Sequence, residues 1–166
     1  MSILREARLS DLPAIEALVK AAYGHYVDRI GKIPGPIRDI DDHRYAHHIE
    51  AGHVSLLFED VTSKKSVDAD NGDEPVGLLV LIPQPDTLLL DNVAVAPTAQ
   101  GRGFGKVLMQ VAEARARQLE FDSITLYTQE LMHDNLAIYR RYGYVETRRV
   151  RERGLDRVYL RKPLIE

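Results

Sequence analysis

The feature that most constrains this chain is a glycine-rich segment, APTAQGRGFGKVL at residues 96–108, that follows an apolar run. Beyond it, apolar residues recur at Phe104, Val107, Leu108 and Val111, which is the spacing of one helix face. Glycine has no Cβ, so the backbone here can direct successive N–H groups at an anion at the start of that helix. The segment therefore predicts a strand, a loop that holds a pyrophosphate by its backbone, and a helix. The alternative is a flexible turn with no ligand.

Two better-known phosphate-binding loops do not match this segment. Dinucleotide-binding folds need G-x-G-x-x-G and an acidic residue after the next strand, whereas this loop reads G-x-G-x-G and the strand SITLYT ends without an acid. The P-loop pattern G-x-x-x-x-G-K-[ST] fails because Gln100 and Val107 stand where glycine and serine or threonine are needed. A nucleotide-dependent oxidoreductase is therefore disfavoured.

Length and composition predict one globular domain over residues 1–166. The chain has no cysteine, which excludes disulfides, thiolate metal sites and a cysteine nucleophile. Its net charge of −3 gives no bulk attraction to nucleic acid. The longest apolar run, VGLLVLI at 76–82, is too short for a membrane span. We expect a cytoplasmic protein, monomeric or homodimeric, without a nucleic-acid or membrane partner.

Hydrophobic periodicity predicts an α+β fold, a single mixed sheet flanked by helices. Strands are expected at 3–8, 53–60, 76–82, 88–95 and 123–129, and in a closing hairpin at 144–153 and 156–164. Helices are expected at 10–23, capped by Ser10 or Asp11, at 39–52, at 104–119, and at 135–142, capped by Asp134 and ended by Gly143. The polar stretch 62–75 is expected to connect two antiparallel strands.

Two motifs resemble the GNAT superfamily of N-acetyltransferases. VAVAPTAQGRGFGKVLM is similar to its acyl-CoA-binding signature, with Gln100, Gly103 and Gly105 at the signature positions. NLAIYRRYGYVE at 135–146 is similar to a later motif, a short helix with a tyrosine, here Tyr139, four residues before a glycine and an aromatic residue. The resemblance implies a single αβα domain of about seven strands and about four helices. It also implies that the strands at 88–95 and 123–129 splay apart around the cofactor.

The resemblance implies acetyl-CoA as the acetyl donor, with coenzyme A as product. Its pantetheine arm would pair with the backbone of Val93, Ala94 and Val95. Its pyrophosphate would be held by Gln100, Gly101, Arg102, Gly103, Phe104, Gly105 and Lys106. Many relatives carry an asparagine seven residues before the tyrosine, where this chain has Met132. Asn135 lies at i, i+4 from Tyr139 and either performs a related task or serves the helix start.

Acyl transfer to an amine needs an oxyanion donor, a proton for the leaving thiolate and an acceptor for the amine proton. A backbone N–H near Val93 suits the first task, and Tyr139 the second. For the third, the candidates are Asp91, expected on the same strand face as Val93, and Glu130, after the strand at 123–129. Because no cysteine is present to carry the acyl group, direct transfer is expected.

The resemblance implies that the acceptor wall lies between the first two helices. Tyrosines and acids gather there: Tyr23, Tyr26, Tyr45, Asp28, Asp39, Asp41 and Asp42. This composition favours a small cationic amine, with Tyr23, Tyr26 and Glu130 as substrate contacts. A peptide or protein acceptor, a non-catalytic acyl-CoA sensor, and a nucleic-acid module using the arginine-rich closing hairpin are the alternatives. His43 and His47 would share a helix face, but no third ligand is apparent and no metal is expected.

Overall fold

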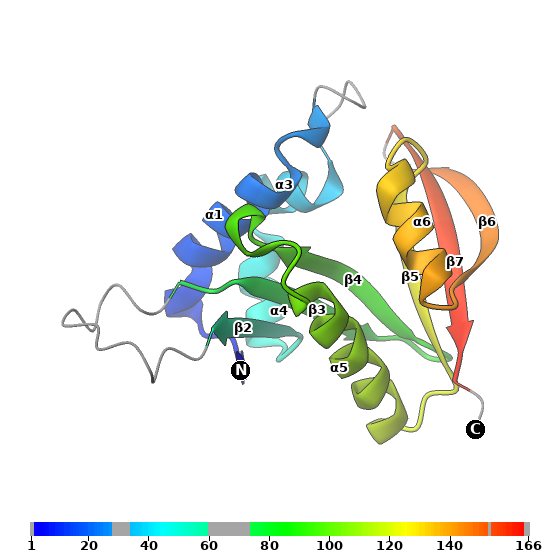
Figure 1. Cartoon of the computed structure of the whole chain (residues 1–166), viewed down its shortest axis with the longest axis horizontal. Helices are drawn as coiled ribbons and strands as arrows, with labels where there is room; N and C mark the ends of the chain where they lie inside the picture. Colours follow the sequence, from blue (N-terminus) through cyan, green and yellow to red (C-terminus); the bar gives the residue numbers. More distant parts are fainter. Residues whose placement is uncertain (1, 28–33, 60–73, 153, 165–166) are drawn as a thin grey trace.

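A seven-stranded sheet organises the computed structural model, which describes residues 2–27, 34–59, 74–152 and 154–164 (Figure 1). The strands are β1 Ser2–Glu6, β2 Val54–Glu59, β3 Gly77–Pro83, β4 Leu88–Val95, β5 Ser123–Gln129, β6 Val145–Glu152 and β7 Leu155–Pro163. Their order is β1-β2-β3-β4-β5-β7-β6. The pairings are antiparallel except for β4 with β5, which is parallel.

Helices cover both faces of the sheet, so the predicted αβα architecture is confirmed. The α-helices in the described residues are α1 Leu12–Tyr23, α3 Gly35–Asp41, α4 Arg44–Glu50, α5 Phe104–Gln118 and α6 His133–Arg141. The first three pack on one face through a cluster that includes Ile15 and Tyr45, and the last two pack on the other through one that includes Leu108 and Leu136. No helix in the described ranges is long and apolar enough to cross a bilayer.

Strands β4 and β5 separate soon after they meet, as predicted (Figure 1). Their pairing runs only from Leu88 opposite Ile124 to Leu90 opposite Leu126. Beyond that point β4 continues beside β3, and β5 continues beside β7. The β5-facing edge of β4 after Leu90 therefore has no strand partner in the described structure, and its backbone groups are open to a ligand.

A β-bulge interrupts β4 at Asp91. Val80 pairs with Asn92 and Leu81 pairs with Leu90, so Asp91 has no opposite residue on β3. A bulge adds one residue to the alternation of side chains. Leu90 packs in the α5 cluster, whereas Asn92 bonds to Tyr23 and Tyr45 on the α1 and α4 side. The extra residue therefore places Asp91 on the same side as Asn92, and the prediction that it shares a face with Val93 is wrong.

The segment predicted as one helix at 39–52 forms two. His43 between them has φ 56, the left-handed region, which ends α3 and starts α4 in a new direction. His43 and His47 therefore do not lie on one helix face. The first of the two helices, α3, begins before the predicted range, with Gly35 and Pro36 in its first turn, where proline is compatible with a helix.

Two predicted helix caps also differ in part from the structure. Asp11 holds the N-cap position of α1, as predicted, but its side chain makes no cap bond to that helix. Its carboxylate bonds to the Arg8 N–H at 2.7 Å and to the Arg5 guanidinium, so it closes the 3-10 turn Leu9–Asp11. Asp134 lies inside the first turn of α6, whose N-cap position is held by Met132. The connection predicted at 62–75 lies mostly outside the described residues, although β2 and β3 on either side of it are antiparallel as expected.

Candidate active site

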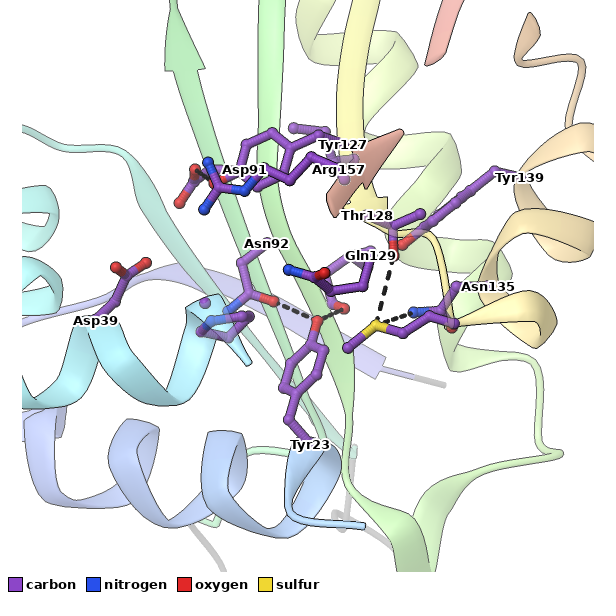
Figure 2. A pocket seen from close by; sticks show the side chains of 15 residues that line it. Tyr23, Asp39, Asp91, Asn92, Tyr127, Thr128, Gln129, Asn135, Tyr139 and Arg157 are labelled. Atoms are coloured by element: carbon purple, nitrogen blue, oxygen red, sulfur yellow. Dashed lines mark hydrogen bonds between the residues drawn. The ribbon is translucent and has the colours of Figure 1, made fainter. Parts of the chain in front are cut away.

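Two adjoining cavities lie where β4 and β5 separate. The larger is a groove of about 480 Å³ between the end of β4, the N-terminus of α5 and α6. The smaller, of about 40 Å³, lies between β4, β5 and the start of α3 (Figure 2). Tyr23, Val93, Asn135 and Tyr139 line both cavities. Molecules bound in the two cavities would therefore meet at these four residues.

The backbone of β4 offers alternate residues to the groove. The Ala96 N–H donates to the Val76 carbonyl at 2.8 Å, so Ala94 and Asn92 direct their backbone groups at β3 in the same alternation. Val93 and Val95 then direct theirs at the groove. Ala94 lines the groove, but the strand register contradicts the prediction that its backbone is offered to a ligand.

Two side chains contact the backbone carbonyls of Val93 and Val95. The Tyr23 hydroxyl lies 2.9 Å from the Val93 oxygen, and the Gln100 amide donates to the Val95 oxygen at 3.3 Å. Because both carbonyls already have a protein partner, the N–H groups of Val93 and Val95 are the better-placed backbone contacts for a ligand.

The glycine-rich loop places the start of α5 against the groove. Gly101 and Gly103 have φ 79 and 88, values that side-chain-bearing residues rarely adopt. Phe104 begins α5, and the first helical bond runs from the Val107 N–H to the Gly103 carbonyl at 3.2 Å. The N–H groups of the first helical turn therefore have no partner within the helix, which is the arrangement that binds anions.

Some residues of this loop line the groove, and others contact the rest of the protein or the solvent. Gln100, Gly101 and Gly105 line the groove. Arg102 is ion-paired with Glu59 and lies over the Phe104 ring, 5.1 Å from its centroid, while Phe104 is buried in the core. Lys106 is exposed. Among the residues predicted here, Arg102, Phe104 and Lys106 do not line the groove.

Helix α6 presents Tyr139 and Asn135 to both cavities (Figure 2). Burial raises the pKa of Tyr139 above its ordinary value, so its hydroxyl is protonated at neutral pH. Within the described ranges that hydroxyl has no hydrogen-bond partner. Asn135 Nδ2 lies 3.7 Å from the Met132 sulfur, which Thr128 Oγ1 also approaches at 3.5 Å. Met132 is therefore a buried support of the site, and Asn135 is the amide that reaches the cavities.

Asp91 and Arg157 bring opposite charges to the smaller cavity. The Tyr127 hydroxyl donates to Asp91 Oδ1 at 3.0 Å, and the Arg157 guanidinium lies over the Tyr127 ring, 4.4 Å from its centroid. Burial raises the pKa of Tyr127, which keeps the hydroxyl a donor. Sequence reasoning missed Tyr127 and Arg157. Alternating arginines on the closing hairpin are typical of a solvated sheet face, so no local signal marked Arg157.

A hydrogen-bond chain joins the helices to β4 beside the cavity. The Tyr23 hydroxyl lies 2.7 Å from Asn92 Oδ1, the Asn92 amide donates to the Tyr45 hydroxyl at 2.9 Å, and Tyr45 donates to the Pro36 carbonyl at 3.0 Å. Burial raises the pKa of both tyrosines, so both remain donors. The chain fixes α1, α3 and α4 against the bulged part of β4.

The other residues predicted to contact the acceptor do not lie together in one site. Tyr26 lines the larger groove, and Asp39 lines the smaller cavity while it pairs with Arg44 at 3.8 Å. Glu130 lines neither cavity, because its exposed side chain pairs with Arg149 of β6 at 3.1 Å, so its predicted role is not supported. Asp28 lies outside the described residues. Within the described ranges no three His, Asp or Glu side chains gather in a metal-binding arrangement.

Sequence comparison agrees with this geometry. The model of the acetyltransferase (GNAT) family matches residues 36–144. N-alpha-acetyltransferase 80 of Mus musculus is 42% identical over 64 residues, which make up 39% of this chain and 19% of that protein. The uncharacterized N-acetyltransferase YvbK of Bacillus subtilis strain 168 is 35% identical over 74 residues, 44% of this chain and 48% of that protein. The matched stretches span less than half the length of these relatives.

Structure comparison shows the same fold. The crystal structure of PaiA N-acetyltransferase from Thermoplasma acidophilum in complex with coenzyme A aligns with a TM-score of 0.72. The alignment covers 98% of this chain and 99% of that chain at 14% sequence identity. At this identity the likeness concerns the fold alone.

Proposed function

The chain belongs to the GNAT acetyltransferase family, and from that premise we propose that residues 1–166 form one domain that transfers an acetyl group from acetyl-CoA to a primary amine. The observation that carries the proposal is the Tyr139 hydroxyl, which has no hydrogen-bond partner among the described residues and lies where the two cavities meet. A long groove on one side of it suits a donor, and a small cavity with charged walls on the other suits an acceptor.

The larger groove has the chemistry that coenzyme A requires. The N–H groups at the start of α5, including those of Gly105 and Lys106, would hold the pyrophosphate. The Val95 N–H would pair with the pantetheine arm, as an added strand does at a sheet edge. The coenzyme A in the structurally similar PaiA protein supports this use of the fold.

The residues at the junction of the cavities supply the proton transfers. The Val93 N–H would donate to the thioester oxygen. Asp91, which has an oxygen beyond the one bonded to Tyr127, would accept a proton from the amine, directly or through water. As the C–N bond forms and the C–S bond breaks, Tyr139 would donate its proton to the thiolate. A phenol of pKa about 10 and a thiol of about 8.5 make this donation mildly uphill in water, and a hydrogen bond to sulfur would favour it.

We place the acceptor amine in the smaller cavity, where Asp39 and Asp91 attract an ammonium group. The cavity volume of about 40 Å³ favours a small acceptor over a macromolecule. We propose direct transfer, because the chain has no cysteine that could carry the acyl group. As in the sequence analysis, a cytoplasmic monomer or homodimer remains the expectation.

A peptide or protein acceptor is the second candidate. It is supported by the similarity to N-alpha-acetyltransferase 80 across 39% of this chain. A protein terminus would need to enter the smaller cavity with its first residue and leave the rest of the peptide outside.

The test is a panel of small amines and peptides with acetyl-CoA, with free thiol release as the readout. Acetylation of small amines is the expected result, whereas transfer to peptides alone would contradict the small-acceptor proposal. Calorimetry with acetyl-CoA and with NAD is the companion measurement. Tight binding of NAD without binding of acetyl-CoA would overturn the donor assignment. Acetyl-CoA binding without transfer to any amine would favour the sensor alternative.

A further inference from the structure

We propose that the acceptor carries a carboxylate beside its amine and that Arg157 binds this carboxylate, which makes the acceptor an amino acid or a similarly small amino carboxylate. The inference rests on the proposed function, since it assigns a substrate class to the same smaller cavity. The expected acceptor is then zwitterionic, whereas the sequence analysis favoured a purely cationic one.

Arg157 is a buried cation with an unused edge. It is 8% exposed and lines the smaller cavity. Its Nη1 donates to Glu152 at 3.1 Å, but its Nε is buried and has no hydrogen-bond partner in the part of the chain that the structure describes. Its Nη2 also has no hydrogen bond to any described residue. Nε and Nη2 form one edge of the guanidinium, and a carboxylate bonds to such an edge through both oxygens. A buried donor without a hydrogen-bond partner costs free energy, so we expect an anion to bind at this edge of the guanidinium.

The guanidinium is held in place from the protein side. Its Cζ lies over the Tyr127 ring, 4.4 Å from the centroid. The Glu152 oxygen that accepts from Arg157 also accepts from the Tyr159 hydroxyl at 2.6 Å. Because Glu152 is shared between these two donors, it does not satisfy Arg157 alone. A Cβ at Gly35 would lie 3.6 Å from Nη2, so the glycine leaves room in front of the free edge.

Asp91 supplies the complementary charge on the same support. Tyr127 donates to Asp91 through its hydroxyl and carries Arg157 on its ring, so one side chain positions both charges. A cavity walled by a carboxylate and a guanidinium matches a molecule that has an ammonium group and a carboxylate. In a small amino acid these two groups are a few bonds apart, so one molecule would reach both charged walls of the cavity.

The test compares free amino acids with their matched α-amides as acceptors, in the wild type and in Arg157→Gln. The wild type should prefer the free acid in kcat/KM by about tenfold or more, the usual value of a hydrogen bond to a charged group. Arg157→Gln should bring the ratio of kcat/KM for the acid to kcat/KM for the amide close to one, while transfer to the amide persists. Arg157→Lys should retain part of the preference for the acid. Amidation also changes the amine pKa, so the change in the ratio between wild type and variant is the decisive number.

Separate controls distinguish a variant that does not fold from a protein that acetylates no amine. Calorimetric titration with coenzyme A reports whether each variant keeps the donor groove. If Arg157→Gln does not fold, Gly35→Val fills the space before Nη2 and should abolish the preference by another route. If no amine is acetylated, the proposed function fails, and binding of the same amino acids and amides to the protein saturated with coenzyme A tests Arg157. The inference is overturned if acids and amides behave alike in the wild type, or if Arg157→Gln preserves the preference.

Discussion

The Tyr127 hydroxyl donates a 3.0 Å hydrogen bond to Asp91 across the opening between β4 and β5. The bond bridges the two strands beyond their last pairing, at the bulge that turns Asp91 toward the smaller cavity. It thereby holds the proposed proton acceptor at the place where the strands have separated.

Substitutions of Tyr127 should distinguish the hydrogen bond of its hydroxyl to Asp91 from the contact of its ring with Arg157. Tyr127→Phe removes the bond to Asp91 but keeps the ring under Arg157, so kcat/KM should fall several-fold while the preference for carboxylate-bearing acceptors persists. Tyr127→Leu removes both contacts and should also reduce the preference. Steady-state kinetics with matched acids and amides measures both effects. Equal loss of the preference in the two variants would contradict the role assigned to the ring.

Tyr139→Phe should lower kcat by about 100-fold or more, because general acid catalysis contributes at least that much, while acetyl-CoA binds with nearly unchanged affinity. Tyr144→Phe is the matched control, since the Tyr144 hydroxyl is buried without a partner and Tyr144 lines neither cavity. Calorimetry and steady-state assays give both numbers. A Tyr139→Phe enzyme with wild-type kcat would remove the proton-donor role.

Asp91→Asn should reduce kcat/KM for the amine by about tenfold or more, because an uncharged amide neither attracts an ammonium group nor accepts its proton. The affinity for acetyl-CoA should stay the same, since Asp91 does not line the larger groove. Asp122→Asn, which changes an exposed carboxylate outside both cavities, is the control. If both variants keep wild-type kinetics, Asp91 is not the proton acceptor.

Gly103→Ala should destabilise the protein by about 1–2 kcal/mol, because its φ of 88 lies in a region that disfavours a Cβ. Gly105→Ala should leave stability unchanged or raise it slightly, since its Cβ would meet Val95 at an ordinary 3.8 Å. It should weaken acetyl-CoA binding, because Gly105 lines the groove. Denaturant unfolding and calorimetry separate the effects. Unweakened binding in Gly105→Ala would place the pyrophosphate elsewhere.

The stability of the fold should decline in alkali. Burial raises the pKa values of Tyr23, Tyr45, Tyr127, Tyr139 and Tyr144. Above pH about 10 the unfolded chain releases these protons while the folded protein keeps them, so the free energy of unfolding falls as pH rises and is unaffected below that point. Urea unfolding from pH 8 to pH 11, with tyrosinate absorbance, measures this. Constant stability over that range would show that the phenols ionise equally in both states.

The motif-bearing half of the chain was predictable because its signals are local. The helix expected at 104–119 is α5 at Phe104–Gln118, and the glycines before it adopt backbone conformations that glycine alone favours. The short helix with Tyr139 is α6, ended by Gly143 at φ 96. Both depend on residues within a few positions of one another, so sequence spacing carries the information.

The acceptor side depended on contacts between distant segments. The β4 bulge arises from pairing with β3, and one extra residue reverses the face on which Asp91 lies. Glu130, one residue beyond β5, is drawn to Arg149 of β6, although its position in the sequence suggested the site. No local pattern predicts such pairings.

The sequence by itself determined the order of elements, the family and the groove proposed for the donor, because periodicity, glycine positions and motif spacing act over short range. Only the tertiary structure decided which charges face the acceptor cavity. Asp91, Tyr127 and Arg157 come from three strands, β4, β5 and β7, and their contact requires the register of the whole sheet. Strand register is fixed by long-range packing, so the acceptor site emerges with the fold.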